Sequence, residues 1–306
     1  MSHLLTPSPS LPLSIIIVNW NTRELLAQCL ESVGNEILAH GTVPKSAEVF
    51  VVDNASTDGS AALVRERFPW VQLIENAENV GFARANNQAM REATGKYIML
   101  LNSDTQLLPG TLPPFLAFME QNPAVGMVGP EIIDGQGKVQ LSWAQFPTLL
   151  TELLGVHLRG RKFLSPEVYA VDWLAGACLL VRREVLEQVG LFDERFFLYS
   201  EETDWCKRIV VAGWQIVYYP AVRVLHYEGR SSIQDRERSY FLLHHSKVLY
   251  AEKHFGRKSA IFLRVGFVML AYLKAGFRWV LGNKPAFCAQ LRFARTLWCN
   301  GSLYHA

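Results

Sequence analysis

The stretch Tyr97-Ile98-Met99-Leu100-Leu101-Asn102-Ser103-Asp104 runs from mostly apolar residues directly into an acidic tip. Such a run predicts a buried strand of an α/β sheet, and ligands of these sheets bind beyond the carboxyl ends of the strands. Asn102 and Asp104 are two residues apart, so in extended geometry their side chains point the same way. An amide oxygen and a carboxylate so placed can bind a hard divalent cation, which can hold a diphosphate. The alternative is a polar turn that ends a strand.

Strand-like and helix-like segments alternate on both sides of this stretch. Apolar, β-branched runs predict strands at residues 13–18, 48–52, 71–74 and 97–101. Helical spacing of apolar residues predicts helices at 23–33, 60–67 and 82–94. This order predicts an α/β fold with parallel strands and right-handed crossovers. Farther along, we expect strands at 125–129, 174–181 and 215–219, helices at 112–121, 183–189 and from 239 onward, and an irregular segment at 134–172.

Polar residues follow four of the predicted strands. The loop after the first strand has no glycine and no P-loop string occurs, which disfavours a dinucleotide-binding loop and a Walker site. A carboxylate such as Asp53 at a strand end can accept hydrogen bonds from a base or a ribose. One such residue alone is typical of a turn, but four such strand ends in one sheet predict a nucleotide-binding crevice. They carry Asn19 and Asn21, Asp53 and Asn54, Asn76 and Asn79, and Asn102 and Asp104.

Several motifs, in this order, resemble those of family-2 glycosyltransferases, which are inverting enzymes with the A-type nucleotide-sugar fold. They are Val18-Asn19-Trp20-Asn21, Val51-Val52-Asp53-Asn54-Ala55-Ser56-Thr57-Asp58-Gly59-Ser60, Asn79-Val80-Gly81-Phe82-Ala83-Arg84-Ala85-Asn86-Asn87 and Leu101-Asn102-Ser103-Asp104. Later motifs resemble the rhamnosyltransferase branch. They are Trp173-Leu174-Ala175-Gly176-Ala177, Val189-Gly190-Leu191-Phe192-Asp193-Glu194-Arg195-Phe196-Phe197, Glu201-Glu202-Thr203-Asp204-Trp205-Cys206-Lys207-Arg208 and His226-Tyr227-Glu228-Gly229.

The resemblance implies a domain plan and two sets of binding residues. Residues 13–255 would form the glycosyltransferase domain, with a nucleotide-sugar half (13–130) and an acceptor half (131–255). A flexible lead-in (1–12) would precede it and a basic amphipathic helical tail (256–306) would follow. The implied donor-binding residues are Asn19, Asn21, Asp53, Asn54, Gly81, Arg84, Asn87 and Ser103. The implied acceptor-binding residues are Trp173, Gly176, Ala177 and Glu201.

The implied metal ligands are Asn102, Asp104 and His226. The family has an Asp-x-Asp motif here, and this chain has Asn at its first position. With one carboxylate missing, the diphosphate of the donor would complete the coordination of Mg²⁺ or Mn²⁺. His226 follows a strand-like segment, and as a ligand it would suit manganese better than magnesium. The alternative is a structural histidine.

The implied catalytic residues lie in a cluster of acids, in which Glu202 would be the general base and Asp204 the reserve. Crowded acids raise one another's pKa, which favours a base that works near neutral pH. Relatives usually carry Asp at the position of Glu202. The alternative is an acidic helix start, since acids favour that end of the helix dipole. Arg208 would be a helical ion-pair partner of Asp204 or a phosphate contact.

Four further residues keep two interpretations each. Arg84 either meets the diphosphate or lies on the solvated face of its helix. Gly81 either allows the backbone to approach the donor or is a turn glycine. Trp173 and Phe192 either form an apolar platform for the acceptor sugar or pack in the core.

The C-terminal part of the chain is strongly basic although the whole chain has a formal net charge of only +2. This overall charge gives no sign of nucleic-acid binding. The basic residues lie among Phe, Trp and Leu, which favours an anionic membrane surface over a solvated helical subdomain. The apolar run 260–273 is interrupted by Arg264 and is shorter than a membrane span, so we expect a helix in the interface. The basic residues are Lys247, Lys253, Arg257, Lys258, Arg264, Lys274, Arg278, Lys284, Arg292 and Arg295.

Cysteine usage and the N-terminus complete the prediction of location. Five scattered cysteines without a C-x-x-C motif fit a reducing compartment, and no basic region precedes the first apolar run as in a secretory signal. We therefore expect a cytoplasmic protein, peripheral on the inner face of the cell membrane, either as a monomer or as a homo-oligomer. The expected reaction is metal-assisted, inverting transfer of a sugar from dTDP-rhamnose or a UDP-sugar to a lipid-linked or polysaccharide acceptor of the cell envelope. The alternatives are an inert nucleotide-sugar-binding protein and a membrane adaptor with the same fold.

Overall fold

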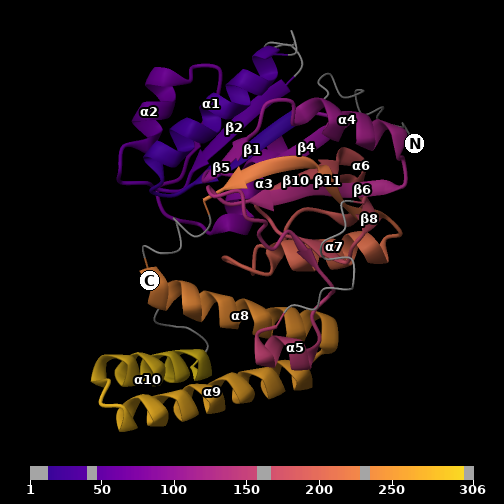
Figure 1. Cartoon of the computed structure of the whole chain (residues 1–306). Helices are drawn as coiled ribbons and strands as arrows, with labels where there is room; N and C mark the ends of the chain where they lie inside the picture. The colour runs from indigo at the N-terminus through magenta and orange to yellow at the C-terminus, as the bar shows by residue number, and fades with distance from the viewer. Residues whose placement is uncertain (1–12, 40–46, 157–166, 228–234, 300–306) are drawn as a thin grey trace, which may run out of the picture.

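The computed structural model describes residues 13–39, 47–156, 167–227 and 235–299. A sheet with helices on both faces forms the upper part of the molecule in Figure 1, and a layer of helices lies beneath it. The predicted lead-in, residues 1–12, lies outside the described residues.

The N-terminal half of the sheet consists of four parallel strands in the order β3-β2-β1-β4. Their bounds are β1 Leu13–Asn19, β2 Ala47–Asp53, β3 Gln72–Glu75 and β4 Tyr97–Asn102. In the register, Asn19 pairs with Asp53, and Val18 pairs with Asn102. The carboxyl ends of β1, β2 and β4 therefore meet at one edge of the sheet, as the alternation of strands and helices predicts.

The C-terminal half of the sheet mixes directions. Beyond β4 the order is β10-β6-β11-β5, with β10 antiparallel to β4 and β6 parallel to β11. The bounds are β5 Thr105–Leu107, β6 Val125–Ile133, β10 Cys178–Arg182 and β11 Gln215–His226. Short strands flank them: β7 Trp143–Ala144 pairs with β9 Trp173–Leu174, and β8 Tyr169–Ala170 pairs with β11.

Three predicted strands differ from the structure, and one of them, predicted at 125–129, continues to Ile133. The single strand predicted at 174–181 is broken into β9 and β10, because residues 175–177 belong to neither strand and line the cavity instead. The strand predicted at 215–219 continues to His226, with an irregularity in its pairing between Tyr219 and Arg223 that spans Pro220. Proline lacks the N–H that a ladder needs, so it is tolerated at such an irregularity.

Helices cover both faces of the sheet (Figure 1). One core contains residues of α1 Arg23–Ala39, α2 Ser60–Arg67 and α4 Leu112–Gln121. The second contains residues of α3 Phe82–Glu92, α6 Arg183–Val189 and α7 Glu201–Val211. Within β1, Ile15 and Ile17 enter the first core and Ile16 the second, because successive side chains of a strand point to opposite faces.

The lower layer contains α5 Leu149–Leu154, α8 Arg236–Phe255, α9 Arg257–Val280 and α10 Lys284–Trp298 (Figure 1). A third apolar cluster joins these helices and includes Leu263, Phe267 and Phe293, with Leu153 and Phe197 packed against it. The helices predicted from residue 239 onward are therefore present, and α5 falls within the segment predicted to be irregular.

Helix α9 has 24 residues, or about 36 Å of length, and is long and apolar enough to cross a membrane by length and composition alone. The core helix of a soluble protein can pass the same test. The helix continues past both ends of the apolar run 260–273. The expectation that this region is too short to span a membrane is therefore wrong as far as the length of the helix is concerned. Only 28% of its most apolar window is buried. The large apolar side chains that it exposes are Ile261, Phe262, Val265, Met269, Tyr272, Leu273, Phe277, Trp279 and Val280.

Gly95 lies where the chain enters β4, and we expect Gly95→Ala to destabilise the fold. A Cβ there would lie 2.5 Å from Ser14 N and 2.6 Å from Leu13 C, both backbone atoms of β1 that cannot move aside alone. The free energy of unfolding, measured by urea denaturation, should fall by about 3 kcal/mol. Gly276→Ala is the control, because a Cβ there meets nothing within 4 Å and the position is helical. An equal loss in both variants would contradict the packing argument.

Candidate active site

A cavity of about 770 Å³ lies at the carboxyl edge of the sheet and extends to the helical layer. Its walls come from the end of β4, the β9–β10 connection, the start of α7, the end of β11 and parts of α5, α8 and α9. Many of the predicted site residues, which are far apart in the sequence, line it together. They are Asn54, Asn102, Ser103, Asp104, Trp173, Gly176, Ala177, Glu201, Glu202 and His226.

The acidic tip of β4 faces the end of β11. Asp104 Oδ1 lies 3.3 Å from His226 Nε2, and the two side chains are only 8% and 12% exposed. Asn102 Oδ1 is buried and has no hydrogen-bond partner among the described residues. Among these residues no group of three His, Cys, Asp or Glu side chains could hold a metal ion. A cation at the tip would therefore need the Asn102 amide oxygen and oxygens of a ligand besides Asp104 and His226.

Gln140 fixes the tautomer of His226. The amide Nε2 of Gln140 donates to the backbone oxygen of His226 at 3.1 Å. This contact turns the amide Oε1 of Gln140 toward the imidazole Nδ1 of His226, at 3.0 Å. Nδ1 therefore carries the hydrogen of a neutral ring, and Nε2 presents a lone pair toward Asp104. Two electron-rich atoms at this distance are stabilised by a metal cation or by a proton on the imidazole. A partner on the far nitrogen is how proteins orient a metal-binding histidine.

Glu201 and Glu202 begin α7 at the cavity wall. One carboxylate oxygen of each, Oε2, is buried without a hydrogen-bond partner in the described part of the chain. Burial raises the pKa of Glu202 to about 7. Burial, and then the charge of Glu202, raises the pKa of Glu201 well above its usual range. A Cβ at Gly176 would lie 3.8 Å from Glu202 Cγ, so residues 176 and 202 form one wall.

The turn before α7 is strained. Tyr199 and Ser200 are consecutive non-glycine residues with φ of 71° and 65°. Each such conformation costs about 1–3 kcal/mol, and the surroundings must stabilise it. Both residues line the cavity, so the strain lies where the chain turns to present the two glutamates.

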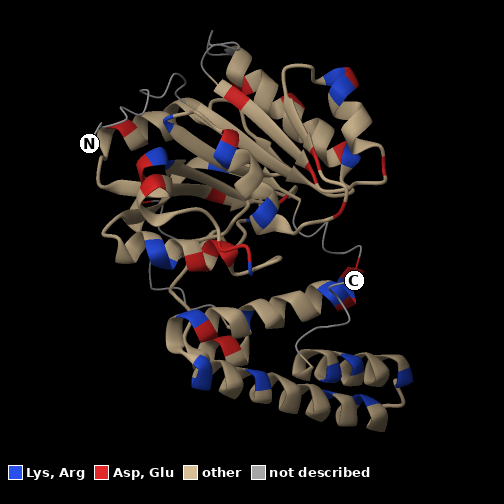
Figure 2. Cartoon of the chain, turned by 180° about the vertical axis from the view of Figure 1, so that it is seen from behind, with Lys and Arg blue, Asp and Glu red and all other residues tan. Residues whose placement is uncertain are grey.

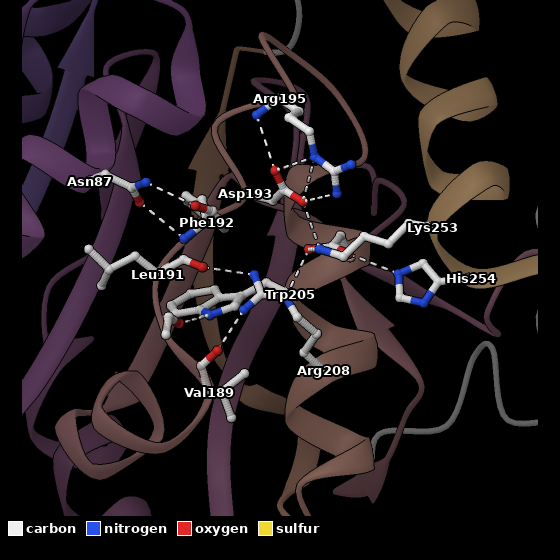
Figure 3. Close-up of polar contacts among 12 residues, drawn as sticks. Asn87, Val189, Leu191, Phe192, Asp193, Arg195, Trp205, Arg208, Lys253 and His254 are labelled. Carbon is white, nitrogen blue, oxygen red and sulfur yellow. Dashed lines mark hydrogen bonds and ion pairs between the residues drawn. The ribbon is translucent and has the colours of Figure 1, made fainter. Parts of the chain in front are cut away.

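Asp204 has a different environment from the glutamates, although it lies on the same helix. Its side chain is fully buried and accepts from Arg208 Nε at 2.9 Å, Lys253 Nζ at 2.7 Å and His254 Nε2 at 2.8 Å (Figure 3). Lys253 also contacts Asp193 at 2.8 Å. Burial alone would raise the pKa of Asp204, but the hydrogen bonds from His254 and Lys253 hold it below its usual range. The reserve role of Asp204 as base is therefore dropped: its carboxylate ties α7 to α8.

The contacts of Arg208 favour its interpretation as an ion-pair partner of Asp204 over its interpretation as a phosphate contact. Besides Asp204, its guanidinium donates to the backbone oxygens of Val189 and Leu191, both at 2.8 Å (Figure 3). Phe192 in the same segment is 4% exposed and packs in the second core, which favours core packing over an acceptor platform. Trp173 is also buried, but it lines the cavity and donates Nε1 to the Gln145 oxygen.

The predicted donor residues of β1 and β2 form a polar network. Asn19 donates to Asp53 Oδ1 and to Ser56 Oγ, both at 3.0 Å, and Asp53 Oδ2 accepts from Ser56 N. Asn21 Oδ1 accepts from Thr57 N at 2.7 Å. These contacts brace the two loops after β1 and β2 against each other. The role of these residues in donor binding stays a prediction.

Three other predicted donor residues lie off the cavity wall. Gly81 has φ +87°, and a Cβ there would lie 2.6 Å from the Phe197 oxygen, so the glycine permits close packing against Phe197. Its role at the donor stays a prediction. Asn87 is buried, and its amide group bonds the backbone N and O of Phe192 at 3.0 and 2.9 Å. The Arg84 side chain is 59% exposed and lies 3.9 Å from Glu194, as on a solvated helix face.

Sequence reasoning missed Gln140, Arg238 and Lys247, which also line the cavity. Gln140 lies in the segment predicted to be irregular, and no motif or spacing marks it. Lys247 lies on α8 and was marked only by the basic composition of the C-terminal part, and no signal marked Arg238 on the same helix.

The strand ends of the parallel half-sheet meet an acidic tip and the neighbouring wall with Glu201 and Glu202. This arrangement defines a nucleotide-sugar transferase fold of the A type. The sequence model of glycosyl transferase family 2 matches residues 14–190, and the chain belongs to this family of glycosyltransferases. The fold class and enzyme class predicted from the sequence are thereby confirmed.

Two relatives are rhamnosyltransferases by name. N-acetylglucosaminyl-diphospho-decaprenol L-rhamnosyltransferase of Mycobacterium tuberculosis is 32% identical over 239 residues, which cover 69% of this chain and 77% of that protein. Rhamnosyltransferase WbbL of Escherichia coli is 28% identical over 202 residues, which cover 60% of this chain and 76% of that protein. The predicted resemblance to the rhamnosyltransferase branch is confirmed.

A solved structure shares the fold. Mannosyltransferase PcManGT of Pyrobaculum calidifontis, in complex with GDP-Man and Mn²⁺, aligns with a TM-score of 0.57 at 18% identity and covers 97% of this chain and 89% of that one. At this identity the likeness supports the fold alone.

The ion pairs of Asp204 predict a pH-dependent loss of stability in Asp204→Asn. Removing one member of a buried pair costs about 3 kcal/mol at pH 7, measured by urea denaturation. The folded pKa of Asp204 is below its ordinary value of 3.8, so its stabilisation is complete above that pH and is lost as the pH falls below it. The difference between wild type and variant should therefore shrink below about pH 4. Glu66→Gln, on the exposed side of α2, should show no difference; a pH-independent loss in Asp204→Asn would contradict the ion-pair account.

Proposed function

We propose that this glycosyltransferase transfers a sugar, with inversion and with help from a divalent cation, from a nucleoside-diphosphate donor to a lipid-linked acceptor. The observation that carries the proposal is that the Asp104–His226 pair and the Glu202 carboxylate open into the same cavity. One group suits the leaving diphosphate and the other suits the acceptor hydroxyl.

The residues at the tip of β4 fit a divalent cation. The buried, unpartnered Asn102 Oδ1, the Asp104 carboxylate and the bare Nε2 of His226 supply oxygen and nitrogen donors, a set that Mn²⁺ accepts and that Mg²⁺ accepts less readily because of the imidazole. A bound cation would neutralise charge on the departing diphosphate. With Asn in place of a first carboxylate, the protein holds it more weakly before the donor arrives.

Glu202 is the proposed base. As the acceptor oxygen forms its bond to the anomeric carbon, the bond from that carbon to the diphosphate breaks, and the hydroxyl proton passes to the Glu202 carboxylate. Attack from the side opposite the diphosphate inverts the anomeric centre. A pKa of about 7 suits this role, because a base near neutrality is both deprotonated often enough and basic enough.

The relatives support the substrate class. Two are named as rhamnosyltransferases, and the name of one gives a diphospho-decaprenol-linked acceptor. We therefore propose dTDP-rhamnose as donor and a lipid-diphosphate-linked sugar as acceptor, at the cytoplasmic face of a membrane. The exposed apolar side of α9 and the basic residues of α9 and α10 support this place (Figure 2). Residues 13–255 would carry the reaction and 256–306 the membrane contact.

We expect Glu202→Gln to lower the transfer rate by about 10²–10⁴-fold, since an amide cannot accept the proton. Donor binding should be unchanged. In wild type, kcat/KM should rise with pH and level off above about 7, because Glu202 must be deprotonated to accept the proton. Product formation followed by chromatography checks both. Glu187→Gln, on α6, is the control; equal and negligible transfer by wild type and Glu202→Gln, with normal donor binding, would favour the inert alternative.

We expect Asp104→Ala to abolish the part of donor binding that needs a cation, because the variant loses the only carboxylate among the three proposed ligands. Isothermal titration with dTDP and UDP, with and without Mn²⁺, measures this. Asp134→Ala, in a turn outside the cavity lining, is the matched control. Unchanged cation-dependent binding in Asp104→Ala would remove the metal role from the tip of β4.

A further inference from the structure

We propose that the part of the cavity between α8 and α9 binds the diphosphate of a prenyl-diphosphate-linked acceptor through Arg238 and Lys274, with Lys247 beside them. This site rests on the proposed function, because it takes the lipid-linked acceptor as its ligand. It adds a second diphosphate site to the donor site at the tip of β4. It also assigns the helical layer a role in acceptor binding.

Arg238 is the main reason for this assignment. It lines the cavity, its Nε is buried, and no described residue accepts a hydrogen bond from that atom. Its guanidinium carbon lies 5.1 Å from the centroid of the Phe197 ring, which holds the cation in place without neutralising it. The nearby acid Asp235 accepts from Arg238 N as the helix cap of α8. A buried donor without an acceptor is costly, and an anionic ligand would supply that acceptor.

Two lysines from facing helices join Arg238 on the cavity wall. Lys247 of α8 pairs with Glu152 of α5 at 2.7 Å, with both side chains about a tenth exposed. Lys274 of α9 forms no ion pair with any residue in the described ranges. Both lysines lie near enough to the buried His244 that their charges add to the effect of burial in lowering its pKa. With Lys247 balanced by Glu152, Arg238 and Lys274 supply the uncompensated positive charge.

The same part of the cavity has an apolar wall that reaches the surface. Leu153 and Leu154 of α5 line it together with Phe267 and Leu270 of α9. The two helices touch here, since a Cβ on Gly266 would lie 2.6 Å from Leu153 Cδ1. Leu154 lines the cavity and is also 63% exposed, so the wall is continuous with the molecular surface.

Beyond this opening the surface stays apolar. Leu150 of α5 is 64% exposed, and Met269 and Leu273 of α9 are 61% and 69% exposed. Neither α9 nor α10 contains an Asp or Glu, and both carry Lys and Arg along their length (Figure 2). A ligand with an apolar chain and an anionic head matches this sequence of surfaces: chain at α5 and α9, diphosphate at Arg238 and Lys274, and sugar toward Glu202 on the same cavity wall.

The test uses farnesyl diphosphate as the probe and the full chain as the protein. The variant is Arg238→Ala with Lys274→Ala. The control is Arg236→Ala with Arg278→Ala, which removes the same two charges from the same two helices but outside the cavity lining. Isothermal titration should show that wild type and control bind the probe and that the cavity variant binds it at least about tenfold more weakly. Farnesol should bind much more weakly than farnesyl diphosphate to wild type.

Three outcomes would overturn the proposal. They are no binding of farnesyl diphosphate to wild type, equal loss in the cavity and control variants, and binding of inorganic pyrophosphate as tight as that of the farnesyl compound. A loss of cation-dependent dTDP or UDP binding in the cavity variant would also overturn it, because the cations would then serve the donor. Failure of the proposed function is distinguishable, since it would appear as absent nucleotide binding or absent sugar transfer in wild type.

A second measurement does not depend on the fold of the variant. Lysines of wild type are acetylated with and without farnesyl diphosphate, and the extent at each is read by mass spectrometry. The probe should protect Lys274 and leave Lys258 and Lys284, outside the cavity lining, as reactive as before. Equal reactivity of Lys274 in both conditions would refute the site.

Discussion

The buried carboxylate of Asp204 is the interaction on which the arrangement of this cavity depends. Asp204 lies one turn into α7, and Glu201 and Glu202, the first two residues of this helix, face the cavity. Its partners Lys253 and His254 belong to α8 (Figure 3). A fully buried charge must be paired, so these contacts fix α7 against α8. Because α8 also carries Arg238 and Lys247, one ion-pair network sets the distance between the proposed base and the proposed acceptor cations.

Glu202 and Asp204 show how environment assigns roles to acids on one helix. Asp204 is fully buried and Glu202 is half-buried at the cavity wall, and burial acts to raise the pKa of each. Asp204 is compensated by three cationic or hydrogen-bonding partners and has a lowered pKa, whereas Glu202 keeps an oxygen without a partner and has a pKa of about 7. The unpaired acid, Glu202, can exchange a proton near neutral pH. The paired acid, Asp204, fixes α7 against α8. Sequence position alone does not separate them, since both lie in one acidic cluster.

The sequence predicted the nucleotide half of the fold well, because strand and helix periods there are local properties. The helices at 60–67 and 112–121 match α2 and α4 in their bounds. In the acceptor half, the helix at 183–189 likewise matches α6. Local patterns did not predict that residues 175–177 interrupt the strand and line the cavity. Nor did they show that Asn87 and Gly81 serve contacts to Phe192 and Phe197, since such partners are set by tertiary packing.

Several unfavourable features lie around the cavity, and a ligand gives them a common reason. Asn102 Oδ1, one oxygen of each glutamate and Arg238 Nε are buried without partners in the described structure, and two left-handed residues precede α7. Each feature costs free energy in the unliganded protein. The three unpartnered acceptor oxygens lie toward the sheet, where a cation and a hydroxyl proton would satisfy them. The unpartnered donor lies on the helical layer, where an anion would satisfy it. This opposite polarity at the two ends of one cavity is the reason to place the donor at the sheet and the acceptor diphosphate between the helices.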